Sequence, residues 1–145
     1  MSGSLPEGPA DGPDGRLLSE LAADGRLPYA ELGRRAGVSE SEARLRVERM
    51  ASDGTIARFT IERGDRGASA VVLVSVESGS DTARISEDLA RMEGAETVYE
   101  ITGQYDILVI MGADTIPAIN AGIDELRRTP GVADTNTVII LRKVG

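Results

Sequence analysis

The sequence lacks cysteine, histidine and tryptophan, and it has only one phenylalanine and three tyrosines. Without cysteine, neither a disulfide framework nor a thiolate site can form. Without histidine, the commonest general base and the commonest neutral metal ligand are also missing. No Gly-rich phosphate loop or cluster with metal-ligand spacing takes their place. We therefore expect no catalytic site, no bound metal and no cofactor.

Long hydrophobic runs are also missing. No apolar stretch approaches the roughly 20 residues that cross a bilayer, so we expect no membrane partner. The first residues are rich in Gly, Pro and acids and carry no basic region, unlike a signal peptide. We expect a flexible tail over residues 1–13 and a cytoplasmic location. With 145 residues, 41% of them hydrophobic, the chain suffices for one domain or two small ones.

Lysine is scarce, because Lys143 is the only one, and acidic residues exceed basic ones by 24 to 16. The resulting net charge of −8 argues at first against nucleic acid. The excess is uneven: residues 70–145 carry 12 acidic and 6 basic side chains, whereas residues 1–60 carry 10 and 8. The bias fits either a GC-rich genome or a salt-adapted proteome, and the composition does not decide between them.

Residues 14–52 have the pattern of three short helices. Asp14 can cap the first helix, Pro28 fits the first turn of the second, and Gly37 fits its C-terminal end. Ser39 and Glu42 have the spacing of a capping box that begins the third helix. A helix, a tight Gly-containing turn and a capped helix are typical of a helix-turn-helix.

The third helix is the candidate for the major groove of DNA. Its outer face would present Arg44, which suits a guanine edge, and Leu45, which suits a thymine methyl. The wider set of predicted DNA-binding residues is Arg35, Ser41, Arg44, Leu45, Arg49 and Arg58. We expect Arg46, at the edge of the inner face, to be structural. Acids on the same helix would repel phosphate and are the strongest local argument against DNA binding.

The segment that follows resembles a strand. Thr55–Glu62 alternates apolar and polar residues, which predicts a strand that could form a wing bearing Arg58. Phe59, the only phenylalanine, is expected in the core. The helix-turn-helix domain would thus span residues 14–61, with a Gly-, Arg- and Asp-rich linker over residues 62–69.

The apolar pattern of the remaining residues, 70–145, predicts four strands and two helices. The expected strands and helices are, in chain order, 70–76, 82–92, 97–102, 105–111, 115–128 and 135–141. This βαββαβ order is ferredoxin-like, so the predicted fold class is α+β with an N-terminal winged helix-turn-helix. Two helices cover only one face of such a sheet, and we expect the other face to form a dimer.

Several short stretches together resemble the Lrp/AsnC family, the leucine-responsive and asparagine-operon regulators of bacteria and archaea. They are Asp24-Gly25-Arg26, Gly37-Val38-Ser39, Gly54-Thr55-Ile56, Val98-Tyr99-Glu100, Thr102-Gly103-Gln104-Tyr105-Asp106, Pro130-Gly131-Val132 and Thr135-Asn136-Thr137. The resemblance covers about residues 14–143 in the family's order. It implies a DNA-binding transcription regulator that forms dimers and often tetramers or octamers.

The resemblance also implies a small effector, usually an amino acid, bound between dimers. The residues matched to that site are Glu100, Gly103, Gln104, Tyr105, Asp106, Thr135, Asn136 and Thr137. Turn amides at Gly103 and Gln104 could bind a carboxylate, and Asp106 or Glu100 an ammonium. A purely structural role for these residues stays open, with Gly103 serving a hairpin and Asp106 capping its turn.

Two other functions remain alternatives. The helix-turn-helix could contact protein instead of DNA, in an assembly or ligand-sensing module. An enzyme is disfavoured because the usual catalytic groups are missing.

Overall fold

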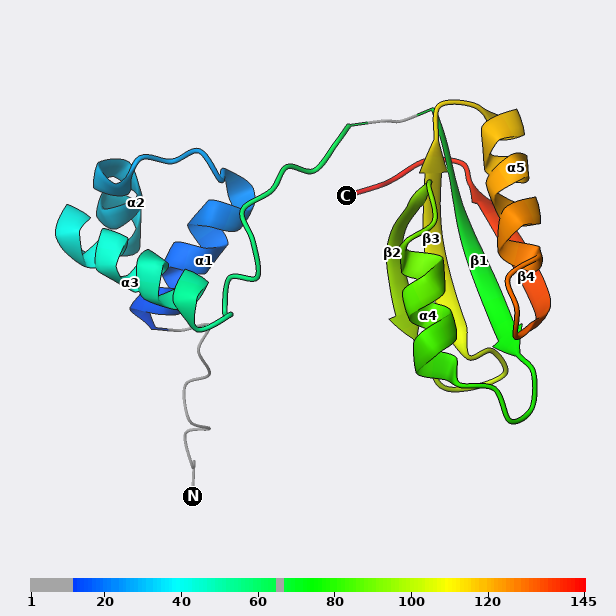
Figure 1. Cartoon of the computed structure of the whole chain (residues 1–145). Coiled ribbons are helices and arrows are strands. Elements are labelled where there is room, and N and C mark those ends of the chain that lie inside the picture. The colour runs from blue at the N-terminus through cyan, green and yellow to red at the C-terminus, as the bar shows by residue number, and fades with distance from the viewer. Residues whose placement is uncertain (1–11, 65–66) are drawn as a thin grey trace, which may run out of the picture. The chain divides into compact units, whose positions relative to one another are not determined.

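The computed structural model describes residues 12–64 and 67–145 (Figure 1). The chain divides into two compact units, with the boundary between Glu62 and Arg63. Each unit has its own cluster of buried hydrophobic residues. The predicted tail over residues 1–13 lies outside the described residues except for its last two, and Pro13 already begins the first helix.

The first unit contains three helices: α1 (Pro13–Ala23), α2 (Tyr29–Ala36) and α3 (Glu40–Ser52). Their apolar residues recur three and four positions apart, so each helix turns one stripe toward a shared core. The core consists of Leu17, Leu32, Ala36, Ala43, Val47 and Met50. Fully burying one such leucine contributes about 1.5–3 kcal/mol.

The turn between α2 and α3 is fixed by local signals that the sequence predicted. Gly37 ends α2 in the left-handed conformation, with φ 77°, which a glycine adopts without a steric penalty. The Ser39 hydroxyl accepts from the Glu42 N–H at 3.1 Å and begins α3. α1 differs from its prediction, because its N-cap is Gly12 and no side chain caps it. Asp14 instead reaches across to arginines of α3.

The prediction of a strand over Thr55–Glu62 is wrong. Residues 57–64 form no helix, strand or turn, so the described part of the first unit has no wing. A strand needs a neighbour for its N–H and C=O groups, and residues 12–62 of this unit contain no other strand. The prediction for Phe59 is also wrong, since this residue is 61% exposed rather than in the core.

The second unit is a four-stranded antiparallel sheet with two helices, and the predicted βαββαβ order is confirmed. The strand order is β2-β3-β1-β4. The observed bounds differ from the predicted ones by up to three residues. They are β1 (Ala68–Val76), α4 (Thr82–Ala90), β2 (Ala95–Glu100), β3 (Ile107–Ala113), α5 (Ile116–Arg127) and β4 (Val132–Ile140).

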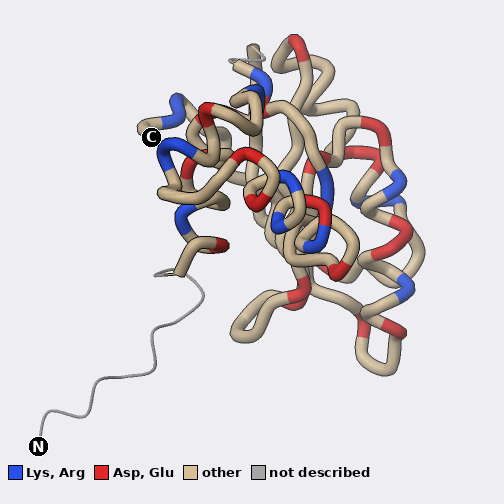
Figure 2. Tube along the Cα trace, turned by 90° about the vertical axis from the view of Figure 1, so that its left-hand side faces the viewer, with Lys and Arg blue, Asp and Glu red and all other residues tan. Residues whose placement is uncertain are grey.

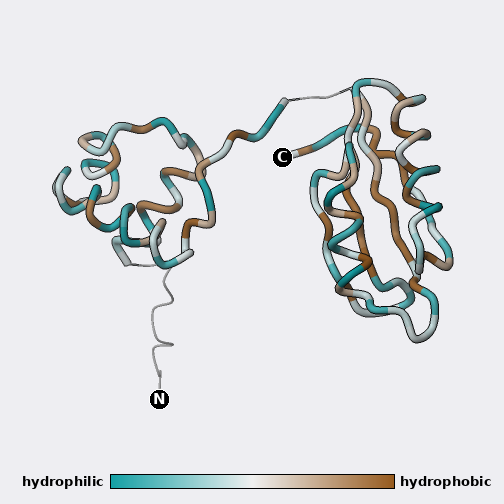
Figure 3. The backbone as a smooth tube through the Cα atoms, viewed as in Figure 1, coloured by the Kyte–Doolittle hydropathy of each residue, from teal (hydrophilic) through white to brown (hydrophobic). Residues whose placement is uncertain are grey.

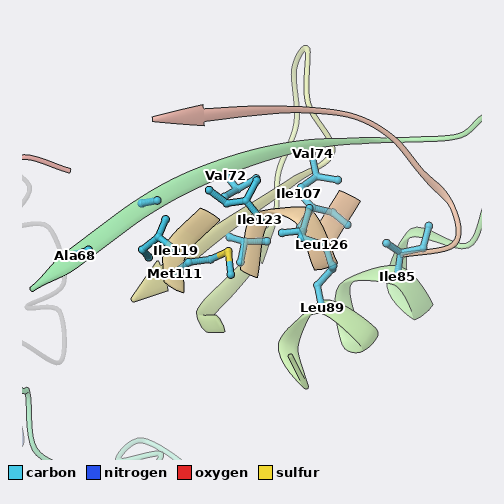
Figure 4. Packing of buried hydrophobic residues seen from close by; sticks show 12 residues of the cluster. Ala68, Val72, Val74, Ile85, Leu89, Ile107, Met111, Ile119, Ile123 and Leu126 are labelled. Atoms are coloured by element: carbon cyan, nitrogen blue, oxygen red, sulfur yellow. The ribbon is translucent and has the colours of Figure 1, made fainter. Parts of the chain in front are cut away.

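Both helices pack on the same face of this sheet. Alternate residues of β1 are buried, and hydrophobic colouring follows the strands (Figure 3). Figure 4 shows Ile119, Ile123 and Leu126 of α5 packed beside Val72 and Val74 of β1, with Leu89 of α4 next to Leu126. The fold class predicted from the sequence, α+β with a helix-turn-helix before a ferredoxin-like domain, is therefore confirmed apart from the wing.

The opposite side of the sheet, here called the open face, carries no helix of the described chain. Val71 lies at its centre, paired with Ile110 of β3 and Val138 of β4. Directly opposite residues of antiparallel strands share a face. The same pairing places Leu73, Tyr99 and Leu108 there. An apolar row on an uncovered sheet face is unusual for a monomer.

Candidate nucleic-acid interface and effector loop

α3 separates its apolar and polar sides. Ala43, Val47 and Met50 are buried in the core of the first unit. Leu45 lies on the other side and is 68% exposed, with no core to fill. A large exposed aliphatic side chain on the second helix of a helix-turn-helix can pack on a thymine methyl group in the major groove.

The N-terminal end of α3 is slightly hollow. Ser39, Glu40, Ser41 and Arg44 line a shallow, open depression of about 410 Å³. The Ser39 and Ser41 hydroxyl oxygens lie 3.3 Å apart. The end of the helix therefore presents hydroxyls and one guanidinium, which can bond to base edges and phosphates, beside one carboxylate, which would repel phosphate.

Arg44 occupies a defined position at this end. Its Cζ atom lies over the Tyr29 ring, 4.9 Å from the ring centroid. Its Nη2 atom is 3.9 Å from Oε1 of Glu40, one turn earlier on α3. Its side chain is nevertheless 55% exposed. Tyr29 could not be predicted as a residue of this site, since nothing in the spacing of α2 and α3 indicates which residues meet across the turn.

The other arginines of α3 are paired with acids. Arg46 contacts Oδ1 of Asp14 at 3.0 Å and Oε1 of Glu42 at 2.9 Å. Both contacts raise the pKa of Arg46, and the Asp14 hydrogen bond contributes most. Arg49 pairs with the other oxygen of Asp14. The structure thus gives Arg46 the role of linking α3 to α1, and it ties Arg49 to the same carboxylate.

Arg35, at the end of α2, is also paired. Its Nε donates to Glu31 at 2.9 Å, and its Nη1 lies 3.4 Å from Glu20 of α1. Glu31 also accepts from Arg34, and hydrogen bonds from both arginines lower the pKa of the Glu31 carboxyl to about 2. A phosphate that contacts Arg35 would have to compete with these carboxylates.

Arg58 stands apart from these residues. It lies in the irregular, exposed segment after α3, where no strand holds it. Acidic and basic positions are interspersed along the chain (Figure 2). Of the predicted DNA-binding residues, the structure brings Ser41, Arg44 and Leu45 together on α3, while Arg35 and Arg49 lie within ion pairs and Arg58 lies elsewhere.

The predicted effector loop connects β2 to β3. Gly103 has φ 118°, a conformation that side chains rarely adopt, and Gly103 and Gln104 are exposed. Glu100, the last residue of β2, is exposed as well, whereas Tyr105 is half-buried. Exposed backbone at a glycine turn leaves amides available for an anion.

Asp106 has a structural role in this loop. Its Oδ2 accepts from the Val76 N–H at 2.9 Å, and its own N–H donates to the Val74 carbonyl at 2.9 Å. These bonds fasten the loop to the end of β1. One carboxylate oxygen is therefore already engaged before any effector ammonium could bind.

The predicted threonines lie on β4 at the same end of the sheet. Val74 of β1 pairs with Thr135 on one side and Ile107 on the other, so Thr135 and the loop are two strand spacings apart, roughly 10 Å. Thr135 Oγ1 accepts from Arg127 Nε at 3.1 Å. Thr137 Oγ1 is buried without a hydrogen-bond partner among the described residues. Asn136 pairs with Leu73 and so lies on the open face.

None of the helices in the described residues is long and apolar enough to cross a membrane. Among residues 12–64 and 67–145, no group of three or more acidic side chains is arranged to hold a metal ion.

Comparison with known proteins gives matches for both units. The family model of the AsnC-type helix-turn-helix domain matches residues 11–51, and that of the Lrp/AsnC ligand binding domain matches residues 69–145. The chain is 41% identical over 133 residues to the HTH-type transcriptional regulator LysM of Saccharolobus solfataricus, covering 91% of this chain and 94% of that protein. The protein of the same name from Sulfurisphaera tokodaii is 36% identical, with 91% and 95% covered.

Solved structures agree with these matches. A feast or famine regulatory protein from M. tuberculosis, complexed with L-methionine, has a TM-score of 0.81 and 28% identity, covering 92% of this chain and 93% of that one. The leucine response regulatory protein of Mycobacterium tuberculosis has a TM-score of 0.77 and 28% identity, with the same coverage.

Proposed function

This chain belongs to the Lrp/AsnC family of transcription regulators, and from that premise we propose that it binds operator DNA through α3 under the control of an amino acid or similar effector. A protein that binds promoter DNA in a bacterium or archaeon works in the cytoplasm, where the DNA is.

The proposal that α3 binds DNA rests on Arg44 and Leu45, an exposed pair near the start of this helix. Arg44 and Leu45 are neighbours, both are more than half exposed, and neither fills the core. Arg44 can donate two hydrogen bonds to one guanine, and Leu45 can pack on a thymine methyl. Ser41, on the same end of the helix, would contact an adjacent phosphate or base. Arg35, Arg49 and Arg58 would add phosphate contacts.

A dimer through the open face would give the protein the two-fold symmetry of paired half-sites. The apolar row centred on Val71 is the surface that supports this proposal. The dimers could assemble further into tetramers or octamers.

Val71→Asp should convert the assembly to the 15.3 kDa monomer in light scattering. Ala83→Asp, on an exposed position of α4, is the matched control and should leave the assembly unchanged.

The loop from Glu100 to Asp106 is the proposed effector site, together with Thr135, Asn136 and Thr137 from a neighbouring dimer. Open amides at Gly103 and Gln104 would take the effector carboxylate. Because Asp106 holds the loop to β1, the exposed Glu100 is the better candidate for the ammonium. The similar regulator complexed with L-methionine supports an amino acid as the class of effector.

Protein contact by the helix-turn-helix is the second candidate. The observation that favours it is the pairing of Arg35, Arg46 and Arg49 with carboxylates, which reduces the positive charge offered to phosphate. In that case no DNA sequence would be preferred at any salt concentration.

The test of DNA readout uses Arg44→Ala on the protein's own promoter fragment. We expect weaker binding and a relaxed preference at one base pair, at a cost of about 1–3 kcal/mol. Arg84→Ala, which removes one positive charge from α4 in the other unit, is the matched control and should change neither. Unchanged selectivity in Arg44→Ala would remove Arg44 from base readout.

The test of effector binding uses a panel of the twenty amino acids. Glu100→Gln should weaken the response of DNA binding to the active amino acid at least about tenfold, since the charge-assisted contact with the effector ammonium would be lost. Glu87→Gln, on α4, is the control. A full response in Glu100→Gln would place the ammonium site elsewhere.

A further inference from the structure

Tyr29 is the residue of the DNA-binding unit that contacts the proposed base-reading arginine from another helix. It is the first residue of α2 and is partly buried against the core of the first unit. Its ring lies under the Arg44 guanidinium, with 4.9 Å from Cζ to the ring centroid. This distance is within the roughly 6 Å over which a cation is attracted to the face of an aromatic ring.

We propose that Tyr29 is a positioning residue for sequence recognition: its ring holds the Arg44 guanidinium in place before DNA binds. This rests on the proposed function of Arg44 in base readout. The ring attracts the cation through its face, while the guanidinium keeps its fork of N–H donors for other partners. Contact with the ring and bidentate bonding to guanine are thus compatible.

Glu40 acts on the same guanidinium in a different way. Its Oε1 atom lies 3.9 Å from Nη2 of Arg44, an ion pair too long for a hydrogen bond, on the N–H side of the guanidinium that a guanine would use. Both side chains are more than half exposed, and such a pair is weak. On DNA binding Arg44 therefore exchanges Glu40 for the base and retains Tyr29.

The physical benefit is a smaller loss of conformational freedom. An arginine side chain that is free in solution loses up to about 2 kcal/mol of rotamer entropy when it is fixed. A side chain already held against a ring has lost part of it beforehand. The correct base pair then gains from preorganisation, whereas phosphate contacts made elsewhere on the protein do not.

Loss of the Tyr29 ring should change selectivity rather than affinity. Tyr29→Leu should lower discrimination by about 2- to 5-fold at the base pair that Arg44 reads, which is the size of an exposed cation–π contact. Tyr29→Phe keeps the ring and should keep the discrimination. Affinity for a scrambled duplex and its dependence on salt should be unchanged in both variants, because neither loses a charge.

The experiment measures binding of the full-length protein and its variants to its operator, to each single-base-pair variant of the operator and to a scrambled duplex. The Arg44→Ala background completes a double-mutant cycle, in which Tyr29→Leu should have no further effect on discrimination. A uniform loss on all duplexes in Tyr29→Leu would mean that Tyr29 only supports the fold, and a loss in Tyr29→Phe would mean that its hydroxyl contacts DNA. Either result would overturn the inference.

The proposed function of Arg44 in base readout and the inference about Tyr29 can be refuted separately. If Arg44→Ala does not change discrimination, base readout by Arg44 fails and Tyr29 has nothing to position. If Arg44→Ala changes discrimination and Tyr29→Leu does not, only the inference about Tyr29 fails. A measurement on the unaltered protein guards against a misfolded variant: the side-chain proton resonances of Arg44 should be shifted upfield by the Tyr29 ring current. Resonances at ordinary arginine positions would contradict the contact.

Discussion

Gly33→Ala tests how closely α2 approaches the turn that orients α3. A Cβ added at Gly33 would lie 2.8 Å from the Val38 carbonyl oxygen, 2.9 Å from the Ser39 carbonyl oxygen and 3.1 Å from the Ser39 carbonyl carbon. All three atoms belong to the backbone, so no side chain can rotate away. The turn itself is held by the Val38 N–H, which donates to the Gly33 carbonyl at 2.9 Å.

The size of the effect follows from two opposing contributions. Alanine is favoured over glycine within a helix by about 1 kcal/mol. Overpacking a well-packed site costs about 1–3 kcal/mol, and contact with backbone on two sides puts this position at the upper end. The net loss should be about 1–2 kcal/mol, a substantial part of the roughly 3–8 kcal/mol expected for a unit of this size.

Hydrogen exchange followed by mass spectrometry measures this loss in the correct unit. Amides of α2 and α3 should exchange about 5- to 30-fold faster in Gly33→Ala, while those of β1 should not change. Gly25→Ala is the matched control, because its added Cβ would meet only the Leu21 carbonyl oxygen, at 3.7 Å. Exchange in Gly33→Ala that is equal to or slower than in the wild type would refute the close approach.

Other predictions concern charge and the core. Glu31 has a pKa lowered to about 2, so the stability it adds over Glu31→Gln is fully present above its ordinary pKa of about 4.5; acid titration should show this advantage vanishing as the pH falls toward 2. Leu126→Ala, at a fully buried position of α5, should cost about 2–5 kcal/mol in denaturant unfolding of the second unit; a loss below about 1 kcal/mol would contradict its place in the core. Asp14→Asn should speed hydrogen exchange in α1, because one carboxylate binds two arginines of α3; unchanged exchange would show that these surface pairs contribute nothing.

The parts of the fold that follow from local signals were predictable. Ser39 and Gly37 act within a few residues of themselves, so the start of α3 and the end of α2 could be inferred from sequence alone. Pro28 stands at the N-cap of α2, one residue before the first turn in which it was predicted. The continuous apolar run Val71–Val74 predicts a strand but not which of its residues face the helices, and the alternate burial in β1 appears only in the structure. The segment from Thr55 to Glu62 does alternate apolar and polar residues, but its unit has no described neighbouring strand, and pairing is not a property of one segment.

The candidate sites were predictable in part for a similar reason. Helical periodicity places Arg44 and Leu45 on the outer face of α3. It does not reveal that Asp14 reaches α3 or that Tyr29 lies under Arg44, since both contacts join different helices. Asp106 was recognisable as a turn residue, but its bond to the Val76 N–H spans 30 positions and depends on the register of the sheet.

The central claim is that the first unit recognises a DNA sequence, and one measurement tests it most directly. The purified full-length protein is titrated with its own promoter fragment and with a scrambled duplex over a series of salt concentrations, with and without each of the twenty amino acids. The account predicts tighter binding to the promoter at every salt concentration, a decline in affinity with salt for both duplexes, and a change in promoter binding with one amino acid. Equal affinity for the two duplexes at every salt concentration and with every amino acid would contradict it.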